Sequence, residues 1–190
     1  MVRQNTARRT ALIDAAIEVL AAEGARGLTF RAVDAQAGVP TGTASNYFAN
    51  RDDLLTQAGG RIYERLQPDA AEVADSRSGA RDGDRVAVLI QGVVDRVSSF
   101  KSGYLALLEL RLEATRRPAL RTVLTKHIRA DVDANIRHHL ASGLPGDEDT
   151  VVLLYLAMNW LVVERLTLPD VFGEDEMRRL VTSAVERLLA

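Results

Sequence analysis

The chain has 190 residues, enough for one domain or two small ones, and its hydrophobic content of 47% can supply a full core. The absence of cysteine excludes a disulfide scaffold, a cysteine-ligated zinc site and thiol catalysis. Aromatic residues make up only 5% of the chain, which favours an all-α protein with an aliphatic core. The net charge of −2 is unevenly divided, because residues 1–51 carry six arginines against four acidic residues. A basic N-terminal part is what a phosphate-contacting surface requires.

The N-terminal fifty residues contain three short helical segments. Apolar side chains recur at helical spacing over residues 12–20, and Gly24 ends this first helix. Thr29 can cap a second helix through its hydroxyl, and Gly38 permits the tight turn that follows it. A third helix is predicted over residues 41–48. Two short helices joined by a tight turn are typical of a helix-turn-helix, whose second helix lies in the DNA major groove.

The rest of the chain predicts six more helices. Asn50 can cap a fourth helix that extends to about Leu66, and a polar loop follows over residues 76–84. The fifth to ninth helices are predicted over residues 86–100, 104–116, 118–140, 150–168 and 177–188. We therefore expect a nine-helix, all-α fold, with one domain at residues 1–50 and a second at residues 51–190.

Residues 8–60 resemble the DNA-binding part of the TetR family of bacterial transcriptional regulators. The resemblance rests on Gly24, Leu28-Thr29-Phe30, Ala37-Gly38-Val39, Gly42-Thr43, Tyr47-Phe48 and Arg51-Asp52-Asp53-Leu54-Leu55. Beyond residue 60 it rests only on the number and length of the helices. The DNA-binding residues that it implies are Thr29, Arg31, Pro40, Thr41, Gly42, Thr43, Ser45, Asn46, Tyr47 and Arg51.

Within this set the resemblance implies two roles. The positions that resemble phosphate contacts are Thr29, Thr43, Tyr47 and Arg51. The positions that resemble base-facing residues are Pro40, Thr41, Gly42 and Ser45. Small and polar residues stand at 44–46, where many relatives carry aromatic residues, so the bases that are read do not follow from the sequence. Thr29 can serve as a helix cap as well as a phosphate contact, and Tyr47 can instead pack in the core.

The eighth predicted helix is hydrophobic nearly all round, which requires that it be buried. The resemblance implies that the last two helices pair with their copies in a second subunit as a four-helix interface. The predicted interface residues are Val152, Tyr155, Val163, Met177, Val181, Ala184 and Leu188. The alternative is a monomer in which the eighth helix is the central one.

Polar residues on otherwise apolar helices indicate a small-molecule pocket, because such pockets are mostly apolar with a few placed polar groups. The predicted ligand-binding residues are Tyr63, Tyr104, Leu108, Arg111, His127 and Trp160. Glu109 and Asn159 are pointers of the same kind, although Glu109, Arg111 and Glu113 can instead form surface pairs. The expected ligand is an apolar or amphipathic small molecule whose identity the sequence leaves open.

Enzyme chemistry finds little support. The three histidines fall in no metal-binding pattern, and the sequence has no Gly-rich phosphate loop, so we expect no metal, no cofactor and no catalytic residue. A helical enzyme with Glu109 and Glu113 as paired carboxylates is one alternative, and a helical interaction module is another. The longest apolar run, residues 151–163, is too short to span a bilayer, and residues 1–10 do not resemble a signal peptide. We therefore expect a cytoplasmic protein without a membrane segment.

These features together predict a dimeric, TetR-like regulator that binds a palindromic operator in double-stranded DNA. A repressor that a small-molecule effector releases from the operator is the favoured form of this hypothesis. A constitutive DNA-binding regulator without a ligand is the alternative for the effector part. The operator sequence, the regulated genes and the sign of regulation are left open.

Overall fold

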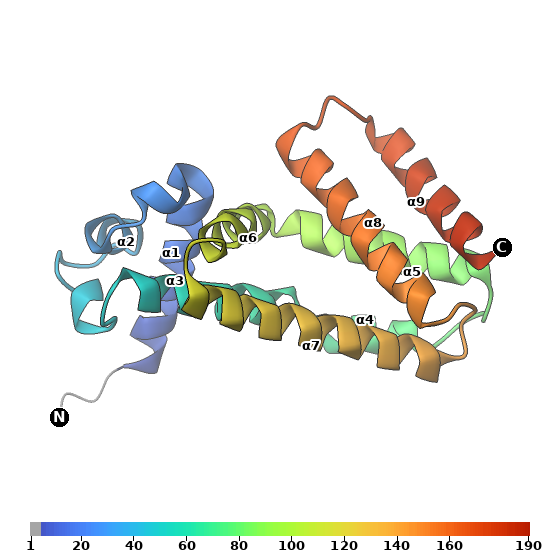
Figure 1. The fold of residues 1–190 in the computed structure, drawn as a ribbon, viewed down its shortest axis with the longest axis horizontal. Helices are drawn as coiled ribbons and strands as arrows, with labels where there is room; N and C mark the ends of the chain where they lie inside the picture. The colour runs from blue at the N-terminus through green and yellow to red at the C-terminus, as the bar shows by residue number, and fades with distance from the viewer. Residues whose placement is uncertain (1–4) are drawn as a thin grey trace. The chain divides into compact units, whose positions relative to one another are not determined.

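The structure of the chain, a computed structural model, describes residues 5–190, which form nine α-helices, one short 3₁₀ helix and no β-strand (Figure 1). The predicted all-α, nine-helix fold is therefore confirmed. The chain divides into two compact units. One unit comprises the chain up to Leu66 together with Phe100–His127, and the other comprises Gln67–Ser99 and Ile128–Ala190. The predicted domain boundary at residue 50 stays a prediction.

The first unit is organised around its N-terminal helix, which packs against the next two α-helices of the unit and against α6. Its elements are α1 (Thr6–Gly27), α2 (Phe30–Gln36), the 3₁₀ helix η1 (Ala44–Asn46), α3 (Arg51–Leu66), α6 (Lys101–Ala114) and the first turns of α7 (Pro118–Ser142). The fully buried side chains of its core include Leu12, Ile17, Leu20, Leu28, Leu54, Leu55, Ile62 and Leu110. Burial stabilises the fold by about 1.5–3 kcal/mol for each such side chain, so a firm core supports the short α2 and η1.

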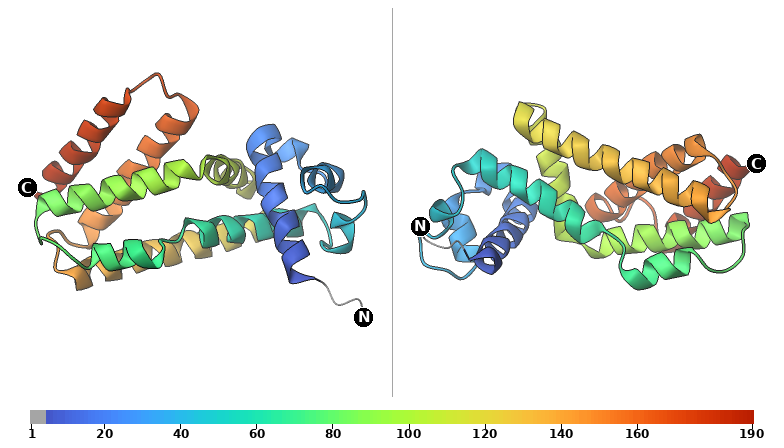
Figure 2. Two further views of the ribbon diagram at one scale, coloured as in Figure 1. Left: turned by 180° about the vertical axis from the view of Figure 1, so that it is seen from behind. Right: turned by 90° about the horizontal axis from the view of Figure 1, so that it is seen from below.

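The second unit is a helical bundle in which α8 and α9 run antiparallel and both pack on α5 (Figures 1 and 2). Its elements are α4 (Ala70–Ser76), α5 (Gly83–Ser99), the rest of α7, α8 (Glu148–Thr167) and α9 (Glu174–Leu189). Val132 and Ile136 of α7 pack with Val151 of α8 in a small apolar cluster. The aliphatic core that the composition predicts is therefore present in this unit as well.

The predicted helix boundaries hold where a cap partner lies within a few residues. The Thr29 hydroxyl accepts from the Ala32 amide at 3.1 Å, and Asn50 Oδ1 accepts from the Asp53 amide at 2.9 Å. Pro118 opens α7 as predicted, which suits a residue without an N–H. The Thr29 and Asn50 side chains thus satisfy amides that the first turn of a helix leaves without a partner.

Two predictions about elements are corrected. The third helix, predicted over residues 41–48, is only a 3₁₀ turn at Ala44–Asn46, because Gly42 has a φ of 92° and cannot belong to an α-helix. Sequence reasoning also missed α4. Its start is fixed by a capping box, in which Asp69 and Glu72 each accept from the other's backbone amide.

Helix α8 is longer than the apolar run that the sequence suggested. By length and composition alone this helix could cross a membrane, and only 22% of its most apolar window is buried within the chain. The apolar run at residues 151–163 lies within this helix, and the expectation that the run is too short to span a bilayer stays a prediction. The exposed face of α8 includes Leu153, Leu156 and Trp160, of which Trp160 is 65% exposed.

Candidate nucleic-acid interface

The segment between α2 and α3 is largely exposed and packs on buried apolar side chains. Pro40, Thr41, Gly42, Ser45 and Asn46 are exposed, whereas Thr43 and Tyr47 are half-buried. Val33 and Phe48 are buried beneath this segment. The residues predicted to contact DNA at positions 40–47 are thus presented together on one short stretch of chain. Thr29 and Arg31 at the start of α2 are exposed as well.

A buried carboxylate holds this segment in place. Asp34 of α2 is 1% exposed, and its two oxygens accept from the amides of Gly42 and Ala44, each at 2.7 Å. Its backbone carbonyl also accepts from the Val39 amide at 3.0 Å. Hydrogen bonds from backbone amides to a carboxylate are short and strong, so Asp34 fixes the path of the chain through residues 39–44.

Sequence reasoning missed Asp34 as a functional residue and counted it only as a charge. No local pattern in the sequence distinguishes Asp34 from a solvated charge, because its partners lie eight and ten residues further on. Arg9 was missed in the same way. Its guanidinium lies 5.2 Å from the centre of the Phe48 ring, and its Nε donates to Gln57 Oε1 at 2.9 Å. An α1 arginine thus stands next to the aromatic ring that supports the exposed segment.

The side chains of the exposed segment also bond to its own backbone. Ser45 Oγ and Asn46 Nδ2 both donate to the Gly42 carbonyl, at 2.8 and 3.0 Å. Thr43 Oγ1 donates to the Pro40 carbonyl. These local bonds replace the regular ladder of an α-helix and hold the polar side chains close to the backbone.

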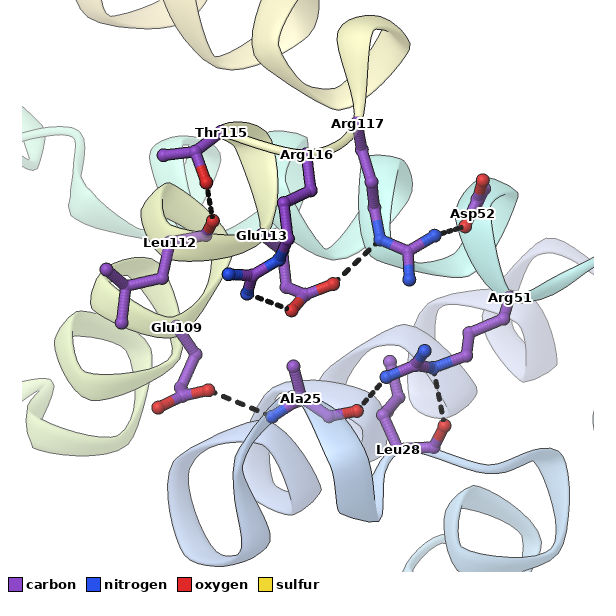
Figure 3. Close-up of polar contacts among 10 residues, drawn as sticks. All are labelled: Ala25, Leu28, Arg51, Asp52, Glu109, Leu112, Glu113, Thr115, Arg116 and Arg117. Atoms are coloured by element: carbon purple, nitrogen blue, oxygen red, sulfur yellow. Dashed lines mark hydrogen bonds and ion pairs between the residues drawn. The ribbon is translucent and has the colours of Figure 1, made fainter.

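Arg51, predicted as a phosphate contact, is engaged within the protein (Figure 3). Its Nε donates to the Leu28 carbonyl at 3.0 Å, and its Nη2 donates to the Ala25 carbonyl. A cation at the start of α3 opposes the helix dipole, and a nearby phosphate would offset this cost. The two carbonyl groups supply another explanation, because they satisfy the guanidinium inside the subunit.

Five of the six residues predicted to bind a ligand lie in the first unit, and Trp160 lies in the second. Tyr63 and Tyr104 are buried, and the Tyr63 ring stacks on His127 with centroids 5.6 Å apart. Leu108 is half-buried and Arg111 is exposed. Trp160, on α8, is 65% exposed in the chain, and its role in ligand binding stays a prediction.

The second unit contains a hollow of about 340 Å³ that none of the six predicted ligand residues lines. Arg165 lies at its edge and donates to Asp95 Oδ1 at 2.9 Å and to Glu174 Oε1 at 3.3 Å. The apolar part of its lining comprises Leu166, Pro169, Phe172 and Met177. Within residues 5–190 no group of three or more His, Cys, Asp or Glu side chains could hold a metal ion.

The two glutamates of α6 make different hydrogen bonds. Glu109 Oε2 accepts from the Ala25 amide at 3.0 Å, and Glu113 accepts from Arg116 and Arg117 at 2.8 and 2.7 Å (Figure 3). Hydrogen bonds from Arg117 and Arg116 hold the pKa of Glu113 below its usual value. The two carboxylates thus serve different structural contacts.

The residues predicted at a subunit interface fall into two groups. Met177 and Val181 are buried inside the second unit, so they belong to its own core. The half-buried members are Val152, Tyr155, Val163, Ala184 and Leu188. Val152 and Tyr155 lie against the cluster that α7 and α8 form. The exposed apolar residues of α8 were not in the predicted set, because an all-round hydrophobic helix gives no sign of which face is inside.

Comparison with known proteins places these features in a family. The family model for "Tetracyclin repressor-like, C-terminal domain" matches residues 81–190, more than half of the chain. The model for "Bacterial regulatory proteins, tetR family" matches residues 12–58, which include the exposed segment and Asp34. The N-terminal match covers much of the stretch on which the resemblance rests.

Individual relatives agree with these matches. The HTH-type transcriptional regulator BetI of Rhizobium meliloti is 31% identical over 138 residues, which are 72% of this chain and 64% of that relative. The match thus spans slightly less than two thirds of the relative's length. A TetR-family transcriptional regulator from Rhodococcus sp. has a TM-score of 0.75 and 23% identity, and covers 98% of this chain and 100% of its own. The multidrug binding protein EbrR, complexed with ethidium, has a TM-score of 0.68 and 26% identity. The match covers 96% of this chain and 99% of the EbrR chain. The chain belongs to the TetR family of bacterial regulatory proteins.

Proposed function

We propose that this protein is a transcriptional repressor that binds a palindromic operator as a homodimer and is released from it by a small-molecule effector. The observation that carries the proposal is the exposed segment at residues 40–47, fixed by the two hydrogen bonds to Asp34. Recognition of DNA needs side chains held in one geometry before the duplex arrives. The protein acts in the cytoplasm, where the DNA lies.

The DNA contacts divide by chemistry. Hydroxyl and cationic side chains bind phosphates, and we assign this role to Thr29, Arg31, Thr43 and Tyr47. The segment around Gly42 carries no bulky side chain, which lets the backbone approach base edges closely. The residues that we assign to face the bases are Pro40, Thr41, Gly42, Ser45 and Asn46. Arg51 contacts phosphate only if its guanidinium leaves the carbonyl groups that it now holds.

The subunit contact in this proposal uses the exposed face of α8. Leu153, Leu156 and Trp160 lie on this face, with the half-buried Val163 beside them. Exposed apolar patches of this kind mark interaction sites, and a helix pair from each subunit makes a four-helix interface. A two-fold dimer presents two reading segments to half-sites about 34–36 Å apart.

The effector in this proposal is an apolar or amphipathic molecule. The hollow beside Arg165 is a candidate place for it, because about 300–1,000 Å³ is typical of ligand sites and apolar side chains form much of its lining. The structure of EbrR, which is similar to this chain, holds ethidium, and this supports a small-molecule effector. Linkage requires that an effector which weakens operator binding is itself bound less tightly by the operator complex.

The experiment that tests DNA binding is selection of a duplex from a random-sequence library by the purified protein. Its affinity is then measured by fluorescence anisotropy at two salt concentrations. We expect a palindromic selected site and a steep fall of affinity with salt. Tyr47→Phe should weaken binding to all duplexes alike, because a phosphate contact carries no sequence information. Failure to select any duplex would favour a helical interaction module or an enzyme instead.

The effector part has a separate test. A compound screen by thermal shift should find molecules that raise the melting temperature and also weaken binding to the selected duplex. Coupling of about 1–3 kcal/mol is typical of such linkage. Phe172→Ala should reduce the thermal shift if the hollow is the site. A screen in which every stabilising molecule leaves DNA affinity unchanged would favour a constitutive DNA-binding regulator.

A further inference from the structure

The C-terminal part of α1 is broken, and side chains from two other helices hold the broken end (Figure 3). Gly24 lies inside α1 with a φ of 68° and a ψ of −177°, which interrupts the helix. The amide of the next residue, Ala25, donates to Glu109 Oε2 on α6 at 3.0 Å. Arg51 on α3 donates to the carbonyls of Ala25 and Leu28. Residues 25–28 are therefore bonded to α6 through an amide and to α3 through two carbonyls.

Glu109 is the acceptor on which the Ala25 amide depends. Ala25 is only 5% exposed, so water is a poor substitute for the carboxylate, and a buried amide without a partner is costly. The fit at this point is close, because a Cβ on Gly24 would lie 3.2 Å from Glu109 Oε2. Glycine at position 24 thus suits both the positive φ and the space that the carboxylate leaves.

We propose that Glu109 is a positioning residue for DNA binding. By accepting from Ala25, it fixes the direction in which the chain leaves α1 and enters α2. The N-cap of α2, Thr29, follows this segment directly. A rotation within residues 24–28 would therefore turn α2 and the segment that Asp34 holds. The inference rests on the proposed function, because it assigns a role in binding a duplex.

A second hydrogen bond between α6 and α1 provides a matched control. Ser102 Oγ donates to Glu18 Oε1 at 2.8 Å, so it also joins these two helices. Glu18 lies in the regular part of α1, before the break at Gly24. Loss of this bond affects the packing of α6 on α1 without releasing the end of α1 that leads to α2.

The test compares Glu109→Ala, Glu109→Asp, Glu109→Gln and Ser102→Ala with the wild type, each first shown to be folded by circular dichroism. Affinity is measured for the duplex that the wild type selects and for an unrelated duplex of equal length. We expect Glu109→Ala to lower affinity for the selected duplex about tenfold, the effect of one lost hydrogen bond to a charged group. Affinity for the unrelated duplex should fall less than affinity for the selected duplex, because non-specific binding depends mainly on charge and less on the exact orientation of α2.

The other variants separate positioning from general stability. Glu109→Asp is one methylene too short to reach Ala25 and should behave as Glu109→Ala, which keeps the test open if the alanine variant does not fold. Glu109→Gln retains an acceptor and should restore wild-type affinity, and Ser102→Ala should also bind as the wild type. Equal loss on both duplexes, or no loss in Glu109→Ala and Glu109→Asp, would overturn the inference alone. A wild type that selects no duplex would overturn the proposed function as well.

Discussion

At the scale of single residues, Asp34 does the most to shape the exposed segment, because both of its oxygens accept from amides eight and ten residues further on. Asp34→Asn keeps the size of the side chain but turns one acceptor into a donor that faces an amide. We expect the free energy of unfolding to fall by about 1–3 kcal/mol, since a buried amide loses its partner. Affinity for the selected duplex should fall with it. Urea denaturation and fluorescence anisotropy measure the two effects.

The control for Asp34 is Asp53→Asn. Asp53 Oδ2 also accepts from a backbone amide, that of Ala49 at 3.0 Å, but this amide is exposed to solvent. Water can replace the lost acceptor there, so the unfolding free energy should change less. If Asp34→Asn is as stable as the wild type, Asp34 does not hold the segment in the way that the distances indicate.

Arg51 leads to a second residue-scale prediction. Its guanidinium donates to the backbone carbonyls of Ala25, in the last turn of α1, and of Leu28, just after α1. We expect Arg51→Ala to reduce stability, while the slope of log affinity against log salt stays as in the wild type. A phosphate contact would instead lower that slope by about one for each subunit. A flatter slope in the variant would restore Arg51 to the set of phosphate contacts.

The sequence predicted the residue-scale contacts that are local and missed those that are distant. The caps at Thr29 and Asn50 bond to amides three residues ahead, and a cap pattern can be recognised in a short stretch of sequence. Arg51 reaches carbonyls that are 23 and 26 residues earlier, and Glu109 reaches an amide 84 residues earlier. Contacts over such separations depend on the packing of whole helices, which no local pattern specifies.

At the scale of elements, the corner between α6 and α7 is tied to the start of α3. Arg117 donates to Glu113 at 2.7 Å and also pairs with Asp52, so one guanidinium joins the corner to α3 (Figure 3). Its hydrogen bond to Glu113, with that of Arg116, keeps the pKa of Glu113 below the usual 4.5. A lowered pKa in the folded state stabilises the protein above the unfolded-state pKa, and this stabilisation is lost as the pH falls through the folded-state pKa.

Glu113→Gln should therefore remove part of the protein's sensitivity to acid. We expect the variant to be less stable than the wild type at neutral pH, and the difference to shrink as the pH falls below 4.5. Urea denaturation at a series of pH values measures this difference. Glu64→Gln is the control, because Glu64 is an exposed partner of Arg61 and such pairs contribute little. A Glu113→Gln variant that differs equally from the wild type at every pH would contradict this account.

The elements themselves could be predicted where the apolar periodicity is long. Helices α5 and α9 follow such periodicity, whereas α4 has only seven residues, none of them buried. The structure of the exposed segment at residues 40–47 could not be predicted from apolar periodicity for a different reason. Asp34, which lies on another helix, accepts from the Gly42 and Ala44 amides, and the chain passes through Gly42 at a positive φ.

At the scale of the whole molecule, the apolar character of α8 indicated burial without saying what covers each face. Val151, Leu154, Met158 and Val162 face the interior of the second unit. Leu153, Leu156 and Trp160 lie on the opposite face, exposed to solvent in a single subunit. The sequence predicted a subunit contact on α8 and α9 and chose Val152, Tyr155 and Val163 on α8, but it passed over these three exposed residues, because both faces of the helix are apolar.

Leu156→Glu tests whether this face joins two subunits. Leu156 is 58% exposed, so a glutamate there is accommodated in the isolated subunit. In a dimer the same charge would be buried without a partner, at a cost of about 3–5 kcal/mol. We expect the wild type to be a dimer by light scattering at micromolar concentration and the variant to be a folded monomer.

The matched control is Val88→Glu on α5, a site 60% exposed, which should remain dimeric. The monomeric variant should also lose most of its affinity for a two-half-site duplex while keeping its helical content, because each subunit reads only one half-site. A Leu156→Glu protein that stays dimeric would move the subunit contact to another face.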